Sequence, residues 1–118
     1  MARLTKEEVK ERVCRAIEDA APELKKIAAS IMAEPELGYK EDKTSSKVQR
    51  AFDAMGLTYT TGHGRTGLKA RLNGGASGYT VAMIGELDAI VCPKHPAADP
   101  LTGAAHCCGH NIQIANML

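Results

Sequence analysis

The stretch Tyr79–Ile90, YTVAMIGELDAI, predicts the class of fold. From Tyr79 to Gly85 it is apolar at consecutive rather than alternate positions, which is typical of a strand covered on both faces of a sheet. Two carboxylates, Glu86 and Asp88, follow this predicted strand directly. Ligand sites in α/β sheets lie at the carboxyl ends of such strands. The stretch therefore predicts a central strand of an α/β domain with candidate site residues at its end.

The residues at the start of the chain are patterned for helices. Thr5 and Glu8 have capping-box spacing, and apolar residues recur every three or four positions over Val9–Ala20. Pro22 suits the first turn of a second helix, which Pro35 should end. We expect two successive helices here, each with one apolar face turned to the core.

A third helix and two short strands are expected next. The helix should begin near Thr44 and end with Gly56 as its C-terminal cap. The strands are predicted at Leu57–Thr61 and Leu68–Leu72, with a turn at Asn73–Gly75. Helices followed by strands indicate an α/β layered domain. The residues of the third helix expected in the core are Val48, Ala51, Phe52 and Met55.

Composition excludes several classes of protein. The chain has 118 residues, enough for one domain, and its formal net charge is +1 with 25% charged residues. One Phe, three Tyr and no Trp leave few platforms on which bases could stack, so we expect no nucleic-acid partner. No long apolar run or signal-like start is present, so we expect a cytoplasmic protein without a membrane partner. Four cysteines are too few for a secreted disulfide framework, and reduced thiols are expected.

One motif resembles a nucleotide-binding fingerprint. Gly62–Gly67, GHGRTG, fits the glycine spacing, and Asp88 lies at a suitable distance beyond it. The pyrophosphate of a dinucleotide needs a helix N-terminus directly after the glycines. Leu68–Leu72 follows instead, and it is patterned as a strand. We expect the glycines to form a tight loop between strands.

The segment HCCGHN, from His106 to Asn111, carries the strongest chemical signal. In extended backbone Cys108 and His110 point the same way, and Gly109 between them allows the chain to bend around one ion. Asn111 suits the N-cap of a following helix, whose N-terminus favours the thiolate form of Cys108. Zinc needs at least three protein ligands, so two residues do not complete a site. A buried thiol pair beside a loop histidine explains the same residues without a metal.

Glu86 and Asp88 are the nearest candidates for partners of this segment. A carboxylate beside a metal-bound histidine typically orients its ring, and Asp88 suits that role. Glu86 fits equally well as a solvated cap of the strand end.

Three other functions remain open on the residues alone. A redox module would use Cys107 and Cys108, although adjacent cysteines close a strained ring. A small structural metal module would use Cys108, His110 and His106, with Cys107 as a further donor. An interaction domain would use none of them.

Several motifs together resemble one family of enzymes. GELDAI followed by AHCCGHN is similar to the signature of the metal-dependent amidohydrolases of metallopeptidase family twenty, subfamily D. Pro35–Gly56, PELGYKEDKTSSKVQRAFDAMG, resembles their first helical motif, and Gly64–Leu72, GRTGLKARL, resembles their strand entry. The resemblance runs from about Ala28 to the end of the chain, in the family's order.

The resemblance implies roles for individual residues. It assigns Cys108 and His110 as metal ligands and Asp88 as a residue that orients the site. Glu86 stands where more distant relatives carry a metal-binding histidine. His106 matches a family histidine and is given only a site-lining role, as are Glu86 and Asn111. Cys107 is a bystander where the family commonly has alanine, and Gln113 departs from the histidine common at its position.

The resemblance also implies a larger enzyme. Family members hydrolyse the amide bond of N-acyl amino acids or related peptides with two divalent ions, zinc or manganese. Their catalytic domain has an α/β/α layered, zinc-peptidase-like fold, and residues 1–118 correspond to its N-terminal part. Their general base and remaining ligands lie further along the chain than this sequence extends, so we expect the 118-residue chain alone to be inactive. A homo-oligomer, or pairing with the remainder of such an enzyme, is the expected assembly.

Overall fold

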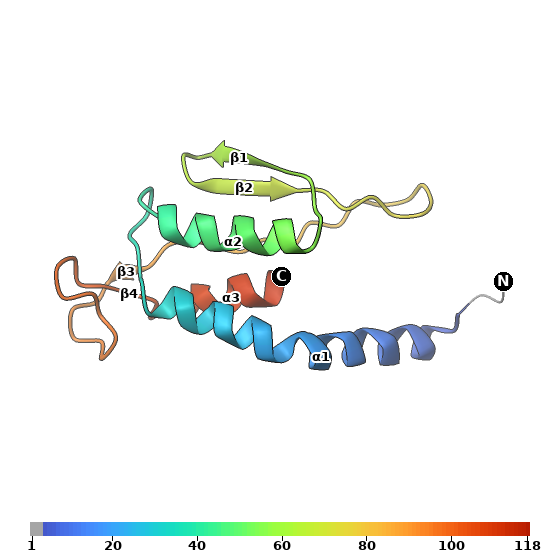
Figure 1. The fold of residues 1–118 in the computed structure, drawn as a ribbon, viewed down its shortest axis with the longest axis horizontal. Helices are drawn as coiled ribbons and strands as arrows, with labels where there is room; N and C mark the ends of the chain where they lie inside the picture. The colour runs from blue at the N-terminus through green and yellow to red at the C-terminus, as the bar shows by residue number, and fades with distance from the viewer. Residues whose placement is uncertain (1–3) are drawn as a thin grey trace.

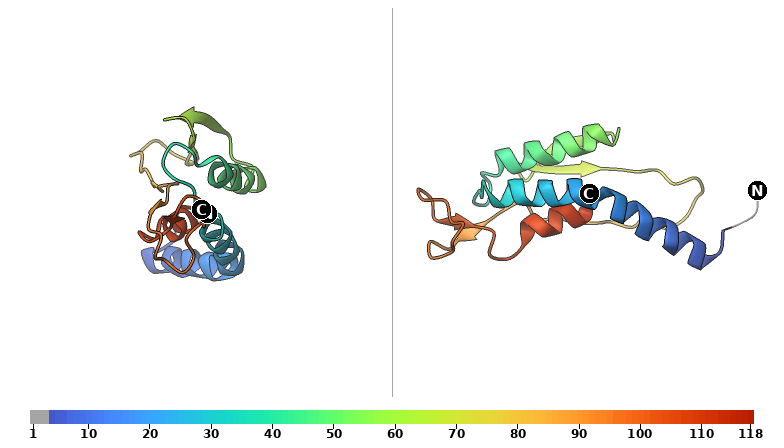
Figure 2. Two further views of the ribbon diagram at one scale, coloured as in Figure 1. Left: turned by 90° about the vertical axis from the view of Figure 1, so that its left-hand side faces the viewer. Right: turned by 60° about the horizontal axis from the view of Figure 1, so that its bottom comes forward.

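The computed structural model describes residues 4–118 as an elongated molecule of 57 × 28 × 22 Å. Helix α2 and a β-hairpin lie on one side of the molecule and the paired helices α1 and α3 on the other, as Figures 1 and 2 show. A second pair of strands, each two residues long, lies at the end of the molecule opposite the N-terminus (Figure 1). The helices and strands in chain order are α1 (Lys6–Met32), α2 (Asp42–Ala54), β1 (Tyr59–His63), β2 (Gly67–Ala70), β3 (Ile90–Val91), β4 (Ala104–Ala105) and α3 (His110–Met117).

Helix α1 is one continuous helix, where the sequence pattern predicted two. Its capping box is present: Glu8 N donates to Thr5 Oγ1 at 3.2 Å, and Thr5 N donates to Glu8 Oε2 at 2.7 Å. Pro22 lies inside the helix and removes one backbone donor, but the turns on either side continue through it. The helix ends at Met32, before Pro35, as expected.

The apolar face of α1 is covered only in its C-terminal half. Ile31 is fully buried, whereas Val9, Val13 and Ile17 are 45–56% exposed. Figure 1 shows the N-terminal half extending past the other helices and the strands. No helix or strand of residues 4–118 covers residues 9–20. The prediction that these residues face a core is therefore wrong.

Helix α2 and the hairpin agree with the sequence pattern to within a few residues. Val48 and Phe52 are buried, and Gly56 ends the helix with a left-handed φ of 67°. Met55, expected in the core, is 47% exposed because it lies past the last helical turn. The hairpin turns at Gly64–Thr66, so the glycines form a tight loop between strands and no helix follows them.

The core forms where α1, α2 and α3 meet. Ile31, Val48, Phe52 and Ile114 make up its buried centre. The ring centroids of Phe52 and Tyr59 are 5.6 Å apart, which joins the hairpin to α2. Helix α3 is therefore held by its apolar side, and this fixes the position of the residues at its N-terminus.

The central strand predicted over Tyr79–Gly85 is absent. Tyr79, Val81, Met83 and Ile84 are at least 68% exposed, and no strand is assigned between Gly78 and Asp88. A strand needs neighbours to accept its backbone hydrogen bonds, and both pairs of strands in residues 4–118 lie elsewhere. The structure is thus a mixture of helices with two small sheets, compatible with the α/β class.

None of the helices in residues 4–118 is both long and apolar enough to cross a bilayer.

Candidate metal centre

Helix α3 begins directly after a tight turn at HCCG. Gly109 N donates to His106 O at 3.2 Å, so Cys107 and Cys108 occupy the centre of the turn. Gly109 has a φ of 79°, a left-handed conformation that glycine adopts without strain, and His110 is the first helical residue. The expectation of an extended Cys108–His110 segment is therefore wrong.

Asn111 lies inside the first turn of α3 and is not its N-cap. It is 3% exposed, and its Nδ2 donates to Ala28 O on α1 at 3.3 Å. Its Oδ1 has no hydrogen-bond partner within residues 4–118. Asn111 thus joins two helices and does not cap one.

The imidazole of His110 lies between two carboxylates. Its Nδ1 is 2.8 Å from the backbone oxygen of Asp88 and 3.2 Å from Asp88 Oδ1. Its Nε2 is 3.1 Å from Glu86 Oε2. A carbonyl oxygen can only accept, so Nδ1 carries the proton in its contact with Asp88. In the neutral ring this leaves the lone pair on Nε2, the arrangement found in histidines that bind metals.

These contacts do not assemble a finished metal site. The two ring nitrogens of His110 face different carboxylates, so Glu86 and Asp88 do not converge with the ring on one point. No group of three His, Cys, Asp or Glu side chains within residues 4–118 is arranged to hold an ion. The structure therefore brings Glu86, Asp88 and His110 together, but it does not bring Cys108 into contact with them.

The two adjacent thiols have different surroundings. A hydrogen bond with the Cys92 thiol is the main cause that raises the pKa of Cys107 above its usual value, and partial burial adds to it. Both Cys107 and Cys108 are exposed, and all four cysteines are free thiols. Cys107 thus interacts with Cys92, the residue after β3, whereas Cys108 lies in the turn directly before α3.

His106 is the most deeply buried ionisable side chain near His110. It is 3% exposed, and neither of its ring nitrogens has a partner within the described residues. Burial is the largest cause that lowers its pKa, and the nearby His110 lowers it further. A neutral imidazole without partners is the form that accepts a metal ion or a hydrogen-bond donor. These orphaned nitrogens and the nearby carboxylates and thiol are chemically compatible with a divalent metal.

Gln113, which had no role assigned from the sequence, contacts this group. Gln113 Oε1 accepts from Glu86 N at 2.6 Å, and Gln113 Nε2 donates to Glu86 Oε2 at 3.4 Å. Its position three residues after His110 could have indicated this role, because such residues share one face of a helix.

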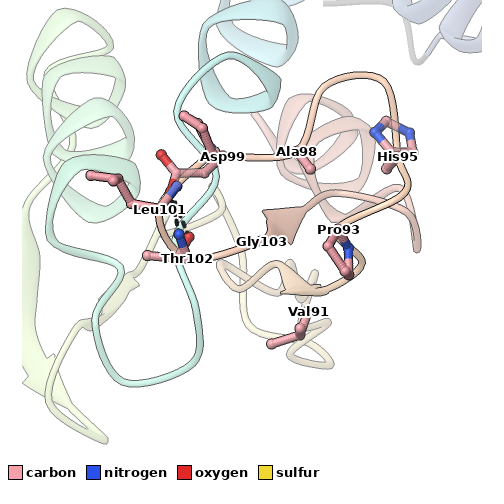
Figure 3. Close-up of a pocket in the computed structure, with 9 residues that line it drawn as sticks. Val91, Pro93, His95, Ala98, Asp99, Leu101, Thr102 and Gly103 are labelled. Atoms are coloured by element: carbon pink, nitrogen blue, oxygen red, sulfur yellow. Dashed lines mark hydrogen bonds between the residues drawn. The ribbon is translucent and has the colours of Figure 1, made fainter.

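The surface of residues 4–118 includes two open cavities of similar size. One of about 360 Å³ borders Glu86 and Asp88, and its other wall includes His63, Thr66 and Gly67 of the hairpin. The larger, about 400 Å³, is lined by the loop between β3 and β4, where Figure 3 shows Asp99 accepting hydrogen bonds from its own loop. None of the predicted site residues lines the larger cavity, so the smaller one is the candidate binding cleft.

Known proteins similar to this chain are hydrolases. The chain is 28% identical to an N-acyl-L-amino acid amidohydrolase of Geobacillus stearothermophilus over 98% of its own length and 31% of the relative's. It is 29% identical to the IAA-amino acid hydrolase ILR1-like 6 of Arabidopsis thaliana, over 80% of this chain and 21% of that protein. It is 32% identical to thermostable carboxypeptidase 2 of Saccharolobus solfataricus, over 78% and 24%. The similarity thus extends over amidohydrolases and carboxypeptidases and does not select one subfamily.

The chain spans about a fifth to a third of the length of these relatives. No family model and no solved structure matches it.

Proposed function

We propose that this chain is the N-terminal part of the catalytic domain of a metal-dependent amidohydrolase, with an α/β/α layered fold. Its substrates are N-acyl amino acids or related amides, as the names of the similar amidohydrolases suggest. Zinc or manganese, as two ions, is the proposed cofactor. The finer placement in subfamily D of metallopeptidase family twenty is part of the same proposal.

The observation that carries this proposal is the contact between His110 and Asp88. Asp88 holds Nδ1 of the ring at 2.8 and 3.2 Å, and this orients Nε2 as a metal donor. His110 and Cys108 are the proposed ligands, and Asp88 is the residue that positions His110. His106, Glu86 and Asn111 line the site.

A bound metal would supply a hydroxide at neutral pH and polarise the amide carbonyl of the substrate. The residues of this chain bind and orient. The neutral, buried His106 provides two ring nitrogens that are free to meet a ligand.

A free general base is not found around the site in residues 4–118. Glu86 and Asp88 contact His110, and Glu36 Oε2 accepts from Thr44 N at 2.8 Å. Glu41 Oε2 accepts from Thr66 Oγ1 at 2.6 Å. Because every one of these carboxylates is engaged, we expect the 118-residue chain alone to bind metal without hydrolysing an amide.

Metal binding and activity are measured separately to test the proposal. Zinc and manganese are titrated into the chain and into His110→Ala, with His95→Ala as control because His95 lies in the loop between β3 and β4 and accepts a hydrogen bond from Ala97 N at 3.1 Å. We expect His110→Ala to lose binding and His95→Ala to keep it. Turnover of N-acetyl amino acids by the pure 118-residue chain would contradict the proposal that this chain holds metal ligands but no free general base.

The second test of the proposed function is to sequence the encoding transcript beyond the codon for Leu118. We expect a Glu-Glu pair and later histidines there, and metal-dependent amide hydrolysis by the product. A thiol redox module would instead form a Cys107–Cys108 disulfide, and a structural metal module would bind zinc tightly without any such extension.

A further inference from the structure

Gln113 contacts both the backbone and the side chain of Glu86. Its backbone N donates to Gln113 Oε1 at 2.6 Å, and its Oε2 accepts from Gln113 Nε2 at 3.4 Å. The preceding residue, Gly85, packs so closely on Ile114 that a Cβ would lie 2.8 Å from Ile114 Cδ1. Two successive residues of helix α3, Gln113 and Ile114, therefore contact the Gly85–Glu86 segment.

With these contacts, Glu86 Oε2 lies 3.1 Å from His110 Nε2. Because Nδ1 keeps its proton and donates to Asp88, a neutral ring presents a lone pair from Nε2 to this oxygen. Two acceptors at this distance repel unless a cation lies between them, either a proton on the ring or a metal ion. Two ligands about 2.1 Å from one metal ion and roughly 90–110° apart lie about 3.0–3.4 Å from each other. The observed separation suits a pair of ligands of one ion.

We propose that Glu86 is a metal ligand beside His110, and that Gln113 is the positioning residue that directs its carboxylate. The inference rests on the proposed function and deepens it, since the sequence analysis gave Glu86 only a site-lining role and Gln113 none. It raises the ligands within this chain from two to three: Cys108, His110 and Glu86. Three protein ligands with one open position is the arrangement of a catalytic zinc site.

The ligand set has a direct consequence for the isolated chain. A carboxylate, an imidazole and a thiolate suit zinc or cobalt(II), and all three lie on two segments packed on each other. Cys108 is exposed on the turn that directly precedes α3, two residues before His110. The proposal therefore predicts that the 118-residue chain takes up a metal ion by itself.

Cobalt(II) alone is the probe, titrated into the chain and its variants in competition with a chelating dye. Glu86→Gln keeps the size of the side chain and removes its charge. We expect cobalt affinity to fall at least about 100-fold, more than the roughly 10–100-fold typical of residues behind the ligands. The thiolate-to-cobalt absorption from Cys108 should remain at saturating metal, while the visible d–d bands change because an oxygen ligand is lost.

Two substitutions of Gln113 separate positioning from packing. Gln113→Met keeps the bulk and loses both hydrogen bonds. Gln113→Glu keeps the acceptor for Glu86 N but puts a second carboxylate against Glu86 Oε2. We expect both to lose about 10-fold or more in cobalt affinity. Gln49→Ala is the matched control, a half-buried glutamine on α2 whose amide donates to Ser45 Oγ at 3.4 Å, and it should bind as the unchanged chain does.

The outcomes are distinguishable. Unchanged or tighter binding by Glu86→Gln would mean that Glu86 is a counter-ion of His110 that competes with the metal. This result overturns the assignment of Glu86 as a ligand, but the proposed function still stands on Cys108 and His110. Unchanged or tighter binding by Gln113→Glu overturns the positioning role. If the unchanged chain takes up no cobalt, both this inference and the proposed metal site fail. Circular dichroism and thermal unfolding of each variant separate lost ligands from lost fold.

Discussion

At the scale of single residues, the site depends on which atoms are already engaged. Asp88 occupies Nδ1 of His110, and the Cys92 thiol engages that of Cys107. Of these residues, His110 keeps Nε2, which faces Glu86, and Cys108 keeps an exposed sulfur. Adjacent residues with the same side chain therefore differ in chemical role because their neighbours differ.

This difference between the two thiols is testable. Cys108→Ser should abolish cobalt or zinc binding, because it removes a proposed ligand. Cys107→Ala should change affinity less than about threefold, since only the contact with Cys92 is lost. Asp88→Asn should weaken binding about 10–100-fold, the range for residues that orient a ligand. Metal content after dialysis compares the variants, and equal damage from Cys107→Ala and Cys108→Ser would show that the pair acts as a unit.

At the scale of the helices and strands, α1 has two halves with different energetic roles. Ile31 is completely buried against α2 and α3, whereas Ile17, on the same helix, is 56% exposed. The same residue type therefore offers a matched pair on one helix.

Truncation of these two residues should have very different effects. Ile31→Ala leaves a cavity and should lower the free energy of unfolding by about 2–5 kcal/mol. Ile17→Ala should change it by no more than about 0.5 kcal/mol, because the side chain is largely in water. Urea unfolding followed by circular dichroism measures both, and equal losses would mean that the N-terminal half of α1 is packed in solution.

The junction of α1 and α2 predicts a dependence of stability on pH. Lys47 and Lys43 hydrogen-bond the Glu34 carboxylate at 2.9 Å each, and these contacts lower its pKa from 4.5 to about 2. A pKa lowered by folding contributes stability that is complete above about pH 4.5 and is lost as pH falls toward 2. Glu34→Gln should therefore reduce the loss of stability between pH 4.5 and 2. Thermal unfolding over this range tests it, and high salt should shrink the difference because the carboxylate is partly exposed.

At the scale of the whole molecule, apolar surface is distributed unevenly. Val81 and Ile84 are 85% and 78% exposed in a segment without strand partners, and the N-terminal half of α1 adds a second apolar face. Contiguous apolar surface of this kind marks sites of association. We propose that the Tyr79–Ile84 segment pairs with another strand, from a second copy of the chain or from the remainder of a longer enzyme.

Association should depend on the apolar residues of this segment. We expect the chain to self-associate with rising concentration and to bind a hydrophobic dye. Val81→Lys should weaken both, whereas Thr80→Lys, at an exposed polar neighbour, should have a smaller effect. Sedimentation equilibrium provides the measurement, and a strict monomer at high concentration without dye binding would contradict the proposal.

The sequence by itself determined the features that depend on neighbouring residues. The Thr5–Glu8 capping box, the end of α2 at Gly56 and the Gly62–Gly67 loop all follow from local backbone preference, and the structure confirms each. The candidate residues Glu86, Asp88 and His110 were also chosen from local motifs.

Only the tertiary structure decided what depends on contacts between distant segments. The strand predicted at Tyr79–Gly85 needs partners that residues 4–118 do not offer it, so its apolar pattern does not produce a strand. Pro22 remains inside α1 although the local pattern suggested a helix start, because helical turns on both sides continue across it. The contact of Gln113 with Glu86 exists because α3 packs on the Gly85–Glu86 segment. Local preference sets where a helix or loop begins, whereas burial and hydrogen bonds between distant segments decide which side chains meet.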